Sequence, residues 1–275
     1  MDSSLENEVV ARRARKITLK ITSFAKNAHI GSCLSCIDIL AALFKFKQNS
    51  LIQKNTVHEV IVSKGHAAAA VYGVLCAMGE IEESKLDEFC KNGSQFYGHV
   101  NHLSHPWIKL STGSLGHGLP FGIGLALSKK LNFDQKNEKI FVLMSDGELN
   151  EGTTWESALI ANRFNLDNVI CVVDRNQIQS FGRTEEVMPL EPLADKWRAF
   201  GWKCLTIDGH DQEQILKLLN DHEGPTVILA DTVKGKGVSF MEDSLDWHYK
   251  SPNSEQLSQA LFEIDGHVND DKELN

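Results

Sequence analysis

Five short apolar runs alternate with segments of helical periodicity along the 275-residue chain, and this alternation limits the possible folds more than any other feature. The runs are rich in β-branched residues and are followed by polar turns, which is typical of buried strands. They lie at 57–63, 139–145, 168–174, 202–208 and 225–231. The helical segments lie at about 7–27, 35–47, 66–79, 82–91, 117–131, 151–164, 190–200 and 211–221. The pattern predicts a single α/β domain over residues 1–275, with a mostly parallel sheet flanked by helices on both faces and a tail at about 251–275.

Charge and composition argue against several classes of partner. Hydrophobic residues make up 42% of the chain and charged residues 24%, which is ordinary for a globular protein, and the formal net charge is −9. A negative chain does not favour nucleic acid or an anionic membrane as a partner, and the basic stretch 11–16 has the spacing of a solvated helix face. The sequence shows neither a signal peptide nor an apolar run near the roughly 18–20 residues of a membrane span, so we expect a cytoplasmic enzyme.

Cys33 and Cys36 form a CxxC pattern ahead of a predicted helix. A zinc site needs a second pair of ligands at close spacing, and none is evident in the sequence. A redox site needs a strand–helix–strand context that this position does not clearly supply. The pattern therefore favours buried structural cysteines over a functional pair.

Two polar residues follow neighbouring strands at the edge where parallel sheets bind ligands. Asp146 and Asn176 are 30 residues apart (176 − 146), about the length of one strand–helix–strand crossover. One carboxylate and one amide carbonyl suit Mg²⁺, and Gly147 allows close approach of an anion to the start of the next helix. Alternatively, Asp146 caps the helix and Asn176 occupies a turn; the spacing favours neither reading.

Glycines and histidines mark further candidate positions. In the segment 111–128, Gly113 to Gly116 are the better candidates for ligand contact, whereas Gly122 and Gly124 suit helix packing; the Gly-Lys-Ser/Thr end of a phosphate-binding P-loop is missing. Four histidines in loops or at helix starts predict a polar pocket that exchanges protons, although single histidines are more often structural. These four are His29, His66, His99 and His248. His102 and His105 have weaker claims, and we interpret the remaining histidines as structural or surface residues, namely His58, His210, His222 and His267.

Together these motifs resemble a known family. The segment "SDGELNEG…WESALIANRFNLDNVICVVDRNQIQ" resembles the thiamine-diphosphate signature. Around it, "AHIGS", "SKGHAAAAVYGVL", "GHVN", "STGSLGHGL" and "TVKGKGVSFMED…WH" resemble, in the same order, the N-terminal segment of transketolases. The resemblance runs from about residue 10 to residue 260 and is closest to the N-terminal subunit of a transketolase that is split into two chains. It implies the thiamine-diphosphate-binding fold.

The resemblance also implies roles for individual residues. Thiamine diphosphate and Mg²⁺, or another divalent cation such as Ca²⁺, are the implied cofactors. The cation ligands would be Asp146, Asn176 and the carbonyl of Ile178. Contacts to thiamine diphosphate would come from Gly147, His66, His248 and Lys234 at the diphosphate and from Gly113 and Leu115 at the rings, and Glu151 matches a carboxylate that faces the partner protomer. His29, His99 and His248 would face the substrate.

Three positions depart from the usual family pattern. Ser145 and Gln177 stand where glycine is frequent, and Tyr249 follows His248 where glycine is usual. The first two departures leave the side-chain ligands in place. Tyr249 makes the assignment of His248 less secure than the others.

The implied activity is transfer of a two-carbon ketol unit from a ketose, with or without phosphate, to an aldose. In the family a second domain supplies a glutamate to the aminopyrimidine ring, and this chain contains no segment that matches that domain. We therefore expect the chain to be inactive alone and to work with a separate C-terminal subunit that carries the pyrimidine-binding domain, as an α₂β₂ assembly. The alternatives are a decarboxylative condensation of the deoxyxylulose-phosphate-synthase type and a non-catalytic regulatory subunit.

Overall fold

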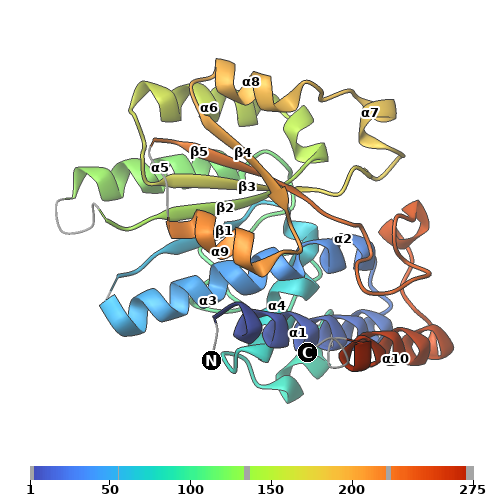
Figure 1. The fold of residues 1–275 in the computed structure, drawn as a ribbon. Coiled ribbons are helices and arrows are strands. Elements are labelled where there is room, and N and C mark those ends of the chain that lie inside the picture. Colours follow the sequence, from blue (N-terminus) through green and yellow to red (C-terminus); the bar gives the residue numbers. More distant parts are fainter. Residues whose placement is uncertain (1–2, 55, 133–136, 221–223, 271–275) are drawn as a thin grey trace.

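The computed structural model describes residues 3–54, 56–132, 137–220 and 224–270, and its centre is a five-stranded parallel sheet between helical layers (Figure 1). The strands are β1 (Glu59–Val62), β2 (Ile140–Ser145), β3 (Val169–Arg175), β4 (Lys203–Asp208) and β5 (Thr226–Asp231). They lie in the order β1-β2-β3-β5-β4, and every neighbouring pair is parallel. The predicted fold class and all five predicted strands are confirmed.

Two apolar cores form because successive strand residues point to opposite faces of the sheet. Phe141, Leu143 and Ile170 point into the larger core, whereas Val142 and Cys171 point into the smaller one. Helices α1 to α4, with α9 and α10, cover the larger core, and α5, α6 and α8 cover the smaller one (Figure 1). Burial on both faces explains why β2, β3 and β5 are almost entirely apolar instead of alternating with polar residues, whereas the edge strand β4 is partly exposed and carries polar residues.

The helices agree with the predicted segments in most places. They are α1 (Ser3–Ala25), α2 (Ile30–Ser35), α3 (Ile37–Lys54), α4 (Ala68–Ala77), α5 (Gly118–Leu131), α6 (Gly152–Arg163), α7 (Thr184–Val187), α8 (Leu193–Ala199), α9 (Gln212–Asn220) and α10 (Ser254–Asp270). Short 3₁₀ helices are η1 (Gly65–Ala67), η2 (Glu83–Glu88), η4 (Gly147–Asn150) and η5 (Leu245–His248).

The differences from the predicted helices are local. The predicted helix at 35–47 corresponds to α3, which continues to Lys54, whereas α2 before it was not expected. The segment predicted as helix at 82–91 forms only the 3₁₀ helix η2. The short α7 was not expected. Neither was α10, which lies in the predicted tail and packs against α1.

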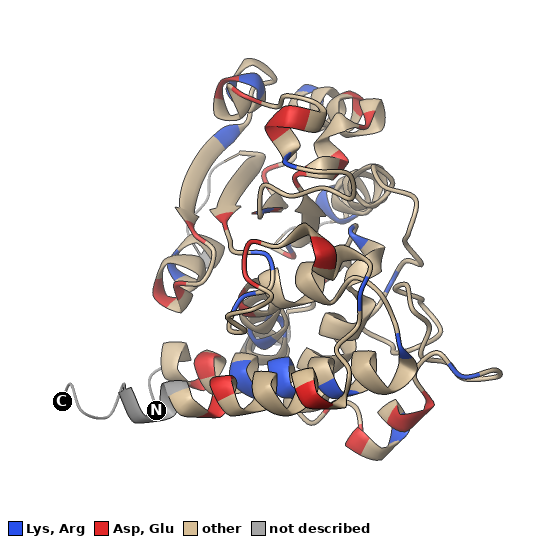
Figure 2. Cartoon of the chain, turned by 90° about the vertical axis from the view of Figure 1, so that its right-hand side faces the viewer, with Lys and Arg blue, Asp and Glu red and all other residues tan. Residues whose placement is uncertain are grey.

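The basic stretch of α1 pairs with acidic residues of other elements. Lys16 contacts Asp265 of α10 at 2.6 Å, and Arg15 pairs with the buried Asp38 of α3. Figure 2 shows blue and red residues close to one another at the bottom of the view, where α1 and α10 pack together. The prediction of a solvated helix face therefore holds for only part of this stretch, because the Arg15 side chain is only 11% exposed.

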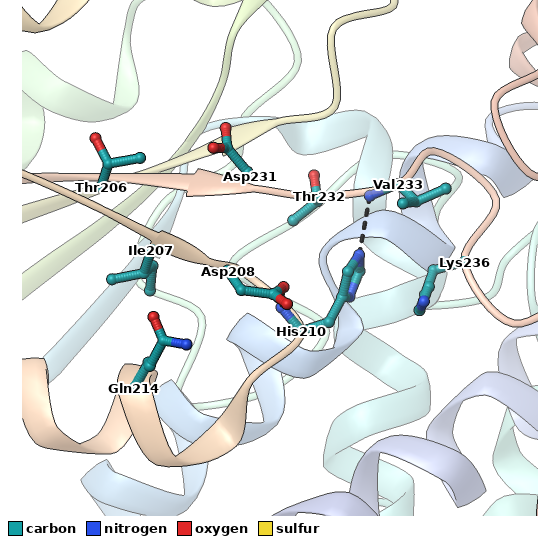
Figure 3. A pocket seen from close by; sticks show the side chains of 9 residues that line it. All are labelled: Thr206, Ile207, Asp208, His210, Gln214, Asp231, Thr232, Val233 and Lys236. Atoms are coloured by element: carbon teal, nitrogen blue, oxygen red, sulfur yellow. Dashed lines mark hydrogen bonds between the residues drawn. The ribbon is translucent and has the colours of Figure 1, made fainter.

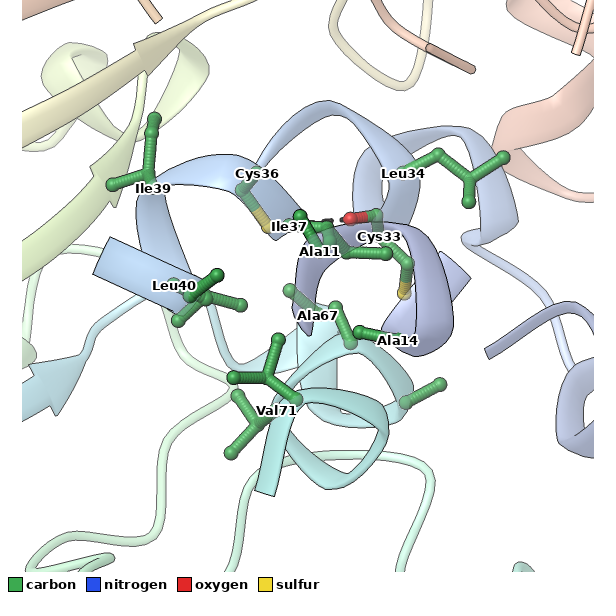
Figure 4. Close-up of a cluster of buried hydrophobic side chains, with 14 of the residues drawn as sticks. Ala11, Ala14, Cys33, Leu34, Cys36, Ile37, Ile39, Leu40, Ala67 and Val71 are labelled. Atoms are coloured by element: carbon green, nitrogen blue, oxygen red, sulfur yellow. Dashed lines mark hydrogen bonds between the residues drawn. The ribbon is translucent and has the colours of Figure 1, made fainter. Parts of the chain in front are cut away.

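Cys33 and Cys36 lie within the larger apolar core, among residues such as Ala11, Ala67 and Val71 (Figure 4). Burial raises the pKa of the Cys33 thiol to about 11 and that of Cys36 to about 12. Thiols held in the protonated form are poor nucleophiles and metal ligands. The structure therefore supports the structural reading of this CxxC pattern.

Across the described ranges, every helix is too short or too polar to span a bilayer.

Candidate functional site

Asp146 and Asn176 lie side by side because β2 and β3 are adjacent parallel strands, with Ser145 opposite Asp174. The two oxygens of Asp146 accept backbone hydrogen bonds from both strand ends, Oδ1 from the Gly147 N–H at 2.7 Å and Oδ2 from the Gln177 N–H at 2.6 Å. The predicted meeting of these residues at one sheet edge is confirmed. Asp146 is also the N-cap of η4, so the alternative reading as a cap describes part of its role.

The environment of Asp146 fits a divalent cation. Its side chain is buried, and within the described ranges it forms no ion pair. Burial and the nearby negative charge of Asp174 raise the pKa of Asp146 to about 6, although backbone N–H donors oppose the shift. The nearby neutral oxygens are Asn176 Oδ1 and the Ile178 carbonyl, and no cluster of three or more acidic, His or Cys ligands occurs in the described residues. One carboxylate with neutral oxygens suits Mg²⁺, which completes its shell from phosphates and water.

Lys234 reaches this site from the segment after β5. Its ammonium donates to the Ile178 carbonyl at 2.9 Å and to Nδ1 of His248 at 3.0 Å. Because an ammonium group only donates, Nδ1 of His248 accepts and its Nε2 carries the proton. Burial and the positive charge of Lys64 lower the pKa of Lys234 to about 8. The carbonyl expected to bind the cation thus has an ammonium partner here, and this bond uses one of its two lone pairs.

The four candidate histidines converge at the same edge. The ring centroid of His29 lies 5.0 Å from that of His248, 5.4 Å from that of His66 and 5.8 Å from that of His99. His29 stands at the start of α2 with a φ of 73°, and its backbone N–H donates to the His248 carbonyl at 2.8 Å. The chain thus brings together side chains that are up to 219 residues apart (248 − 29). The predicted clustering is confirmed.

These imidazoles differ from free histidine in their titration. Burial, His99 and the lysines Lys234 and Lys64 lower the pKa of His29 to about 4. Burial and Lys234 lower the pKa of His248 to about 3, and the pKa of His66 is also well below its ordinary value because of burial and Lys64. These three rings therefore do not titrate near neutral pH as a free imidazole does. At pH 7 they are neutral, so each can donate one hydrogen bond and accept another.

The glycine segment closes one side of the histidine cluster. A Cβ atom at Gly113 would lie 3.1 Å from Cδ2 of His99, so only glycine fits there without displacing that ring. Gly116 has a φ of +81°, and a Cβ atom there would lie 2.7 Å from Cβ of Glu151. Leu115 is half-buried between them. The segment thus contacts both the histidines and the start of α6, where the exposed Glu151 is the N-cap.

Sequence reasoning missed two buried carboxylates. Glu148 accepts hydrogen bonds from the Gly116 N–H at 2.8 Å, the Ser145 N–H at 3.3 Å and the Ser63 hydroxyl, and so joins the glycine segment to the ends of β1 and β2. Asp174 forms a fully buried ion pair with Lys64. Burial alone would raise the pKa of Asp174, but Lys64 and the hydroxyls of Ser35 and Thr232 hold it below its usual value. The pattern "SKGH" and the acidic end of the run "VVDRN" are the only sequence signals for this pair.

The residues that depart from the family pattern all lie at the site. Gln177 has a φ of 63°, a conformation that glycine adopts more readily. Tyr249 is 60% exposed, and its ring centroid lies 4.8 Å from that of His248. Gly147 has tight surroundings, since a Cβ atom there would lie 3.0 Å from Cγ of Gln179. Ser145 is buried at the end of β2.

A separate open cavity of about 540 Å³ lies beyond the ends of β4 and β5 (Figure 3). Its lining includes Asp208, His210 and Lys236 but none of the four site histidines. His210 is held there by Asp38 and by the Val233 N–H, as the dashed line in Figure 3 shows for the latter. The cavity and the predicted site are therefore different places, and the convergent polar groups mark the second of them.

The comparisons with known proteins agree with this geometry. The model of the family described as "Transketolase, thiamine diphosphate binding domain" matches residues 6–262. The chain belongs to this transketolase family. The predicted resemblance is thereby confirmed, as is the assignment of a transketolase-type chain with a thiamine-diphosphate-binding domain.

Three similar family members illustrate the range of chain lengths. The chain is 38% identical over 264 residues to an apulose-4-phosphate transketolase subunit of Phocaeicola vulgatus, covering 94% of this chain and 93% of that one. It is 35% identical over 259 residues to the 6-deoxy-6-sulfo-D-fructose transketolase subunit SqwG of a Clostridium species, covering 91% and 93%. The crystal structure of transketolase from Campylobacter jejuni matches with a TM-score of 0.85 and 27% identity, over 94% of this chain but only 42% of that one. The chain thus spans less than half of that transketolase.

Proposed function

We propose that this chain is the cofactor-binding subunit of a two-chain transketolase, which transfers a two-carbon ketol unit from a ketose or ketose phosphate to an aldose. The observation that carries the proposal is the meeting of Asp146, Asn176 and four histidines at one sheet edge of a transketolase-type domain. Two relatives that match over nearly their whole length are named as transketolase subunits, and their names specify a sugar phosphate and a sulfonated sugar. The cytoplasmic location is part of the same proposal.

Thiamine diphosphate, when bound, supplies the nucleophile and the electron sink for breaking the bond next to a ketose carbonyl. Asp146, Asn176 and the Ile178 carbonyl would hold Mg²⁺, or Ca²⁺ in its place. Lys234 and His66 would neutralise and orient the diphosphate together with the Gly147 N–H, and Gly113 and Leu115 would contact the rings. The neutral rings of His29, His99 and His248 would align sugar hydroxyls and move protons between them.

A separate subunit is expected to complete the site. Glu151 is exposed at the start of α6. The same helix exposes the apolar side chains of Leu159 (57%) and Ile160 (46%), and its C-cap Phe164 is 47% exposed. Exposed apolar side chains on one helix are typical of a contact surface. We therefore propose that this helix faces a partner in an α₂β₂ assembly, with the pyrimidine-binding domain on the other type of chain.

Calorimetry with thiamine diphosphate and Mg²⁺ tests the cation site. Asp146→Ala removes the only carboxylate among the proposed ligands, so we expect at least about tenfold weaker cofactor binding in the presence of Mg²⁺. Unchanged affinity would contradict the assignment.

A turnover assay of the purified chain, with cofactor and Mg²⁺ but without a second subunit, tests the two-chain claim, because turnover by the chain alone would contradict it.

A further inference from the structure

The buried pair of Lys64 and Asp174 lies directly behind the proposed cation site. Both side chains have no exposed surface, and Lys64 also donates to the Ser32 carbonyl at 3.0 Å. Asp174 accepts hydrogen bonds from the Ser35 hydroxyl at 2.6 Å and from the Thr232 hydroxyl. Four segments that are far apart in the chain therefore fix the position of this carboxylate.

The same carboxylate contacts the amide of Asn176. Nδ2 of Asn176 donates to Oδ2 of Asp174 at 3.2 Å, while Oδ1 of Asn176 accepts from the Ile178 N–H at 3.2 Å. Asn176 is 5% exposed, so water cannot readily replace either contact. Within the described residues, these are the two hydrogen bonds of this amide.

An asparagine amide has nearly the same shape in its two flipped orientations but the opposite polarity. Only Oδ1 can bind a cation; the flipped amide would present two N–H groups to it. An ionised carboxylate only accepts hydrogen bonds, so it selects the orientation in which Nδ2 faces it. The adjacent ammonium of Lys64 keeps Asp174 in this form.

We propose that the Lys64–Asp174 pair is a positioning element for the cation, which fixes the amide of Asn176 so that Oδ1 is available as a ligand. The inference rests on the proposed function, in which Asn176 binds the cation. Neither Lys64 nor Asp174 contacts the cation in this arrangement. Their proposed effect is transmitted through the orientation of the amide.

Removal of the pair tests the proposal. In the full chain, Lys64→Met with Asp174→Leu removes both charges together, so that neither is left buried without a partner. We expect the affinity for Mn²⁺, used as the probe in the presence of thiamine diphosphate, to fall about 10–100-fold, as measured by the electron paramagnetic resonance signal of free Mn²⁺. Circular dichroism establishes that the variant is folded.

A rescue variant separates orientation from general damage. Asn176→Asp offers a carboxylate oxygen in either orientation, so in the pair-free chain it should restore Mn²⁺ affinity to within about threefold of the unmutated chain. In the otherwise unmutated chain, Asn176→Asp puts two carboxylates in contact. The gain in Mn²⁺ affinity from Asn176→Asp should therefore be at least about tenfold smaller there than in the pair-free chain. Equal gains in both backgrounds would overturn the proposal.

A second buried pair provides the matched control. Lys47 and Glu59 contact each other at 2.6 Å with side chains 3% and 9% exposed, and Glu59 begins β1 at the opposite edge of the sheet. Lys47→Met with Glu59→Leu should leave Mn²⁺ affinity unchanged. An equal loss in this control would show that removal of any buried pair weakens binding and would overturn the positioning role.

The outcomes also separate this inference from the proposed function. If the unmutated chain does not bind Mn²⁺, the cation site itself is overturned, and the inference with it. If the unmutated chain binds and the pair-free chain binds equally well, only the positioning role is overturned. Should the variant with Lys64→Met and Asp174→Leu fail to fold, Lys64→Gln with Asp174→Asn provides the same test, because an amide at position 174 can donate or accept and so no longer selects one orientation of Asn176. Unchanged Mn²⁺ affinity in this variant overturns the proposal, and a loss of up to about tenfold supports it.

Discussion

His210 and the four site histidines lie at the same edge of the sheet but differ in how their ring nitrogens are satisfied. Nε2 of His210 accepts from the Val233 N–H at 2.9 Å, so its Nδ1 carries the proton and donates to Asp38 at 2.7 Å. By contrast, the described residues offer no hydrogen-bond partner to the rings of His29, His66 and His99, which contact other rings of the cluster instead. A saturated ring joins elements of the fold, whereas unsatisfied neighbouring rings remain free to bind a ligand.

The comparison also shows that the open cavity and the convergent polar groups lie at different places. The cavity of about 540 Å³ lies beside His210, whose nitrogens are already occupied. The histidine cluster is more crowded, yet its polar groups converge. The proposed function therefore places the site where ring nitrogens are free to bind a ligand, and not at the larger cavity.

The largest expected effect is on turnover, from His29→Ala. In the proposed function this neutral imidazole aligns the substrate and exchanges protons with it, so its loss should lower kcat/KM of the proposed two-chain enzyme about 10²–10⁴-fold. Cofactor affinity should change little. His102→Ala, an exposed histidine bonded to Ser111, is the control and should retain turnover. If turnover survives His29→Ala, the clustered histidines do not differ in function from the hydrogen-bonded His210.

His210→Ala should give the opposite result. It leaves Asp38 and the Val233 N–H each short of a partner, so we expect the free energy of unfolding in urea to fall by about 2–3 kcal/mol. Turnover should remain because the His210 ring bonds to Asp38 and the Val233 N–H, and not to the residues proposed to hold the cofactor or the substrate. Lost turnover at unchanged stability would mean that the cavity beside His210, and not the histidine cluster, holds substrate.

The fold was largely readable from the sequence because burial on both faces of the sheet leaves long apolar runs. The neighbouring positions of Asp146 and Asn176 followed from the crossover length. The clustering of His29, His66, His99 and His248 was an inference from their loop positions and the family resemblance, since no spacing rule brings together residues 219 positions apart.

The Lys64–Asp174 pair and the neutral histidines were not predictable in the same way. Asp174 ends an apolar run, and its partners Ser35, Lys64 and Thr232 come from three other segments. The lowered pKa of His29 arises mainly from burial, and burial is a property of the folded chain. Both features depend on tertiary contacts that leave no periodic signal in the sequence.

Acid unfolding tests the His210 side of the comparison further. Arg15 and the bond to His210 outweigh the effect of burial and lower the pKa of Asp38 to about 2. A carboxylate with a depressed pKa stabilises the fold above its unfolded pKa near 3.8, and this contribution, about 2 kcal/mol, is lost as the pH falls toward 2. In Asp38→Asn, the free energy of unfolding should therefore depend less steeply on pH between 4 and 2 than in the unmutated chain. Equal slopes would show that Asp38 is not the stabilising carboxylate.

The smallest expected effect concerns backbone strain at the cofactor edge. Gln177 has a φ of 63°, and its N–H donates to Asp146, so its conformation is fixed by the site and not by its own preference. Gln177→Gly should raise the free energy of unfolding by up to about 1 kcal/mol, because glycine adopts this conformation without a Cβ clash. The control is Asn165→Gly at a φ of 46°, where the gain should be smaller since asparagine tolerates this region. If Gln177→Gly is more stable and keeps its Mg²⁺ affinity, the Gln177 side chain is tolerated at the site but not needed there. If the variant is more stable but binds Mg²⁺ more weakly, the strained conformation is retained because the exposed side chain contributes to the site.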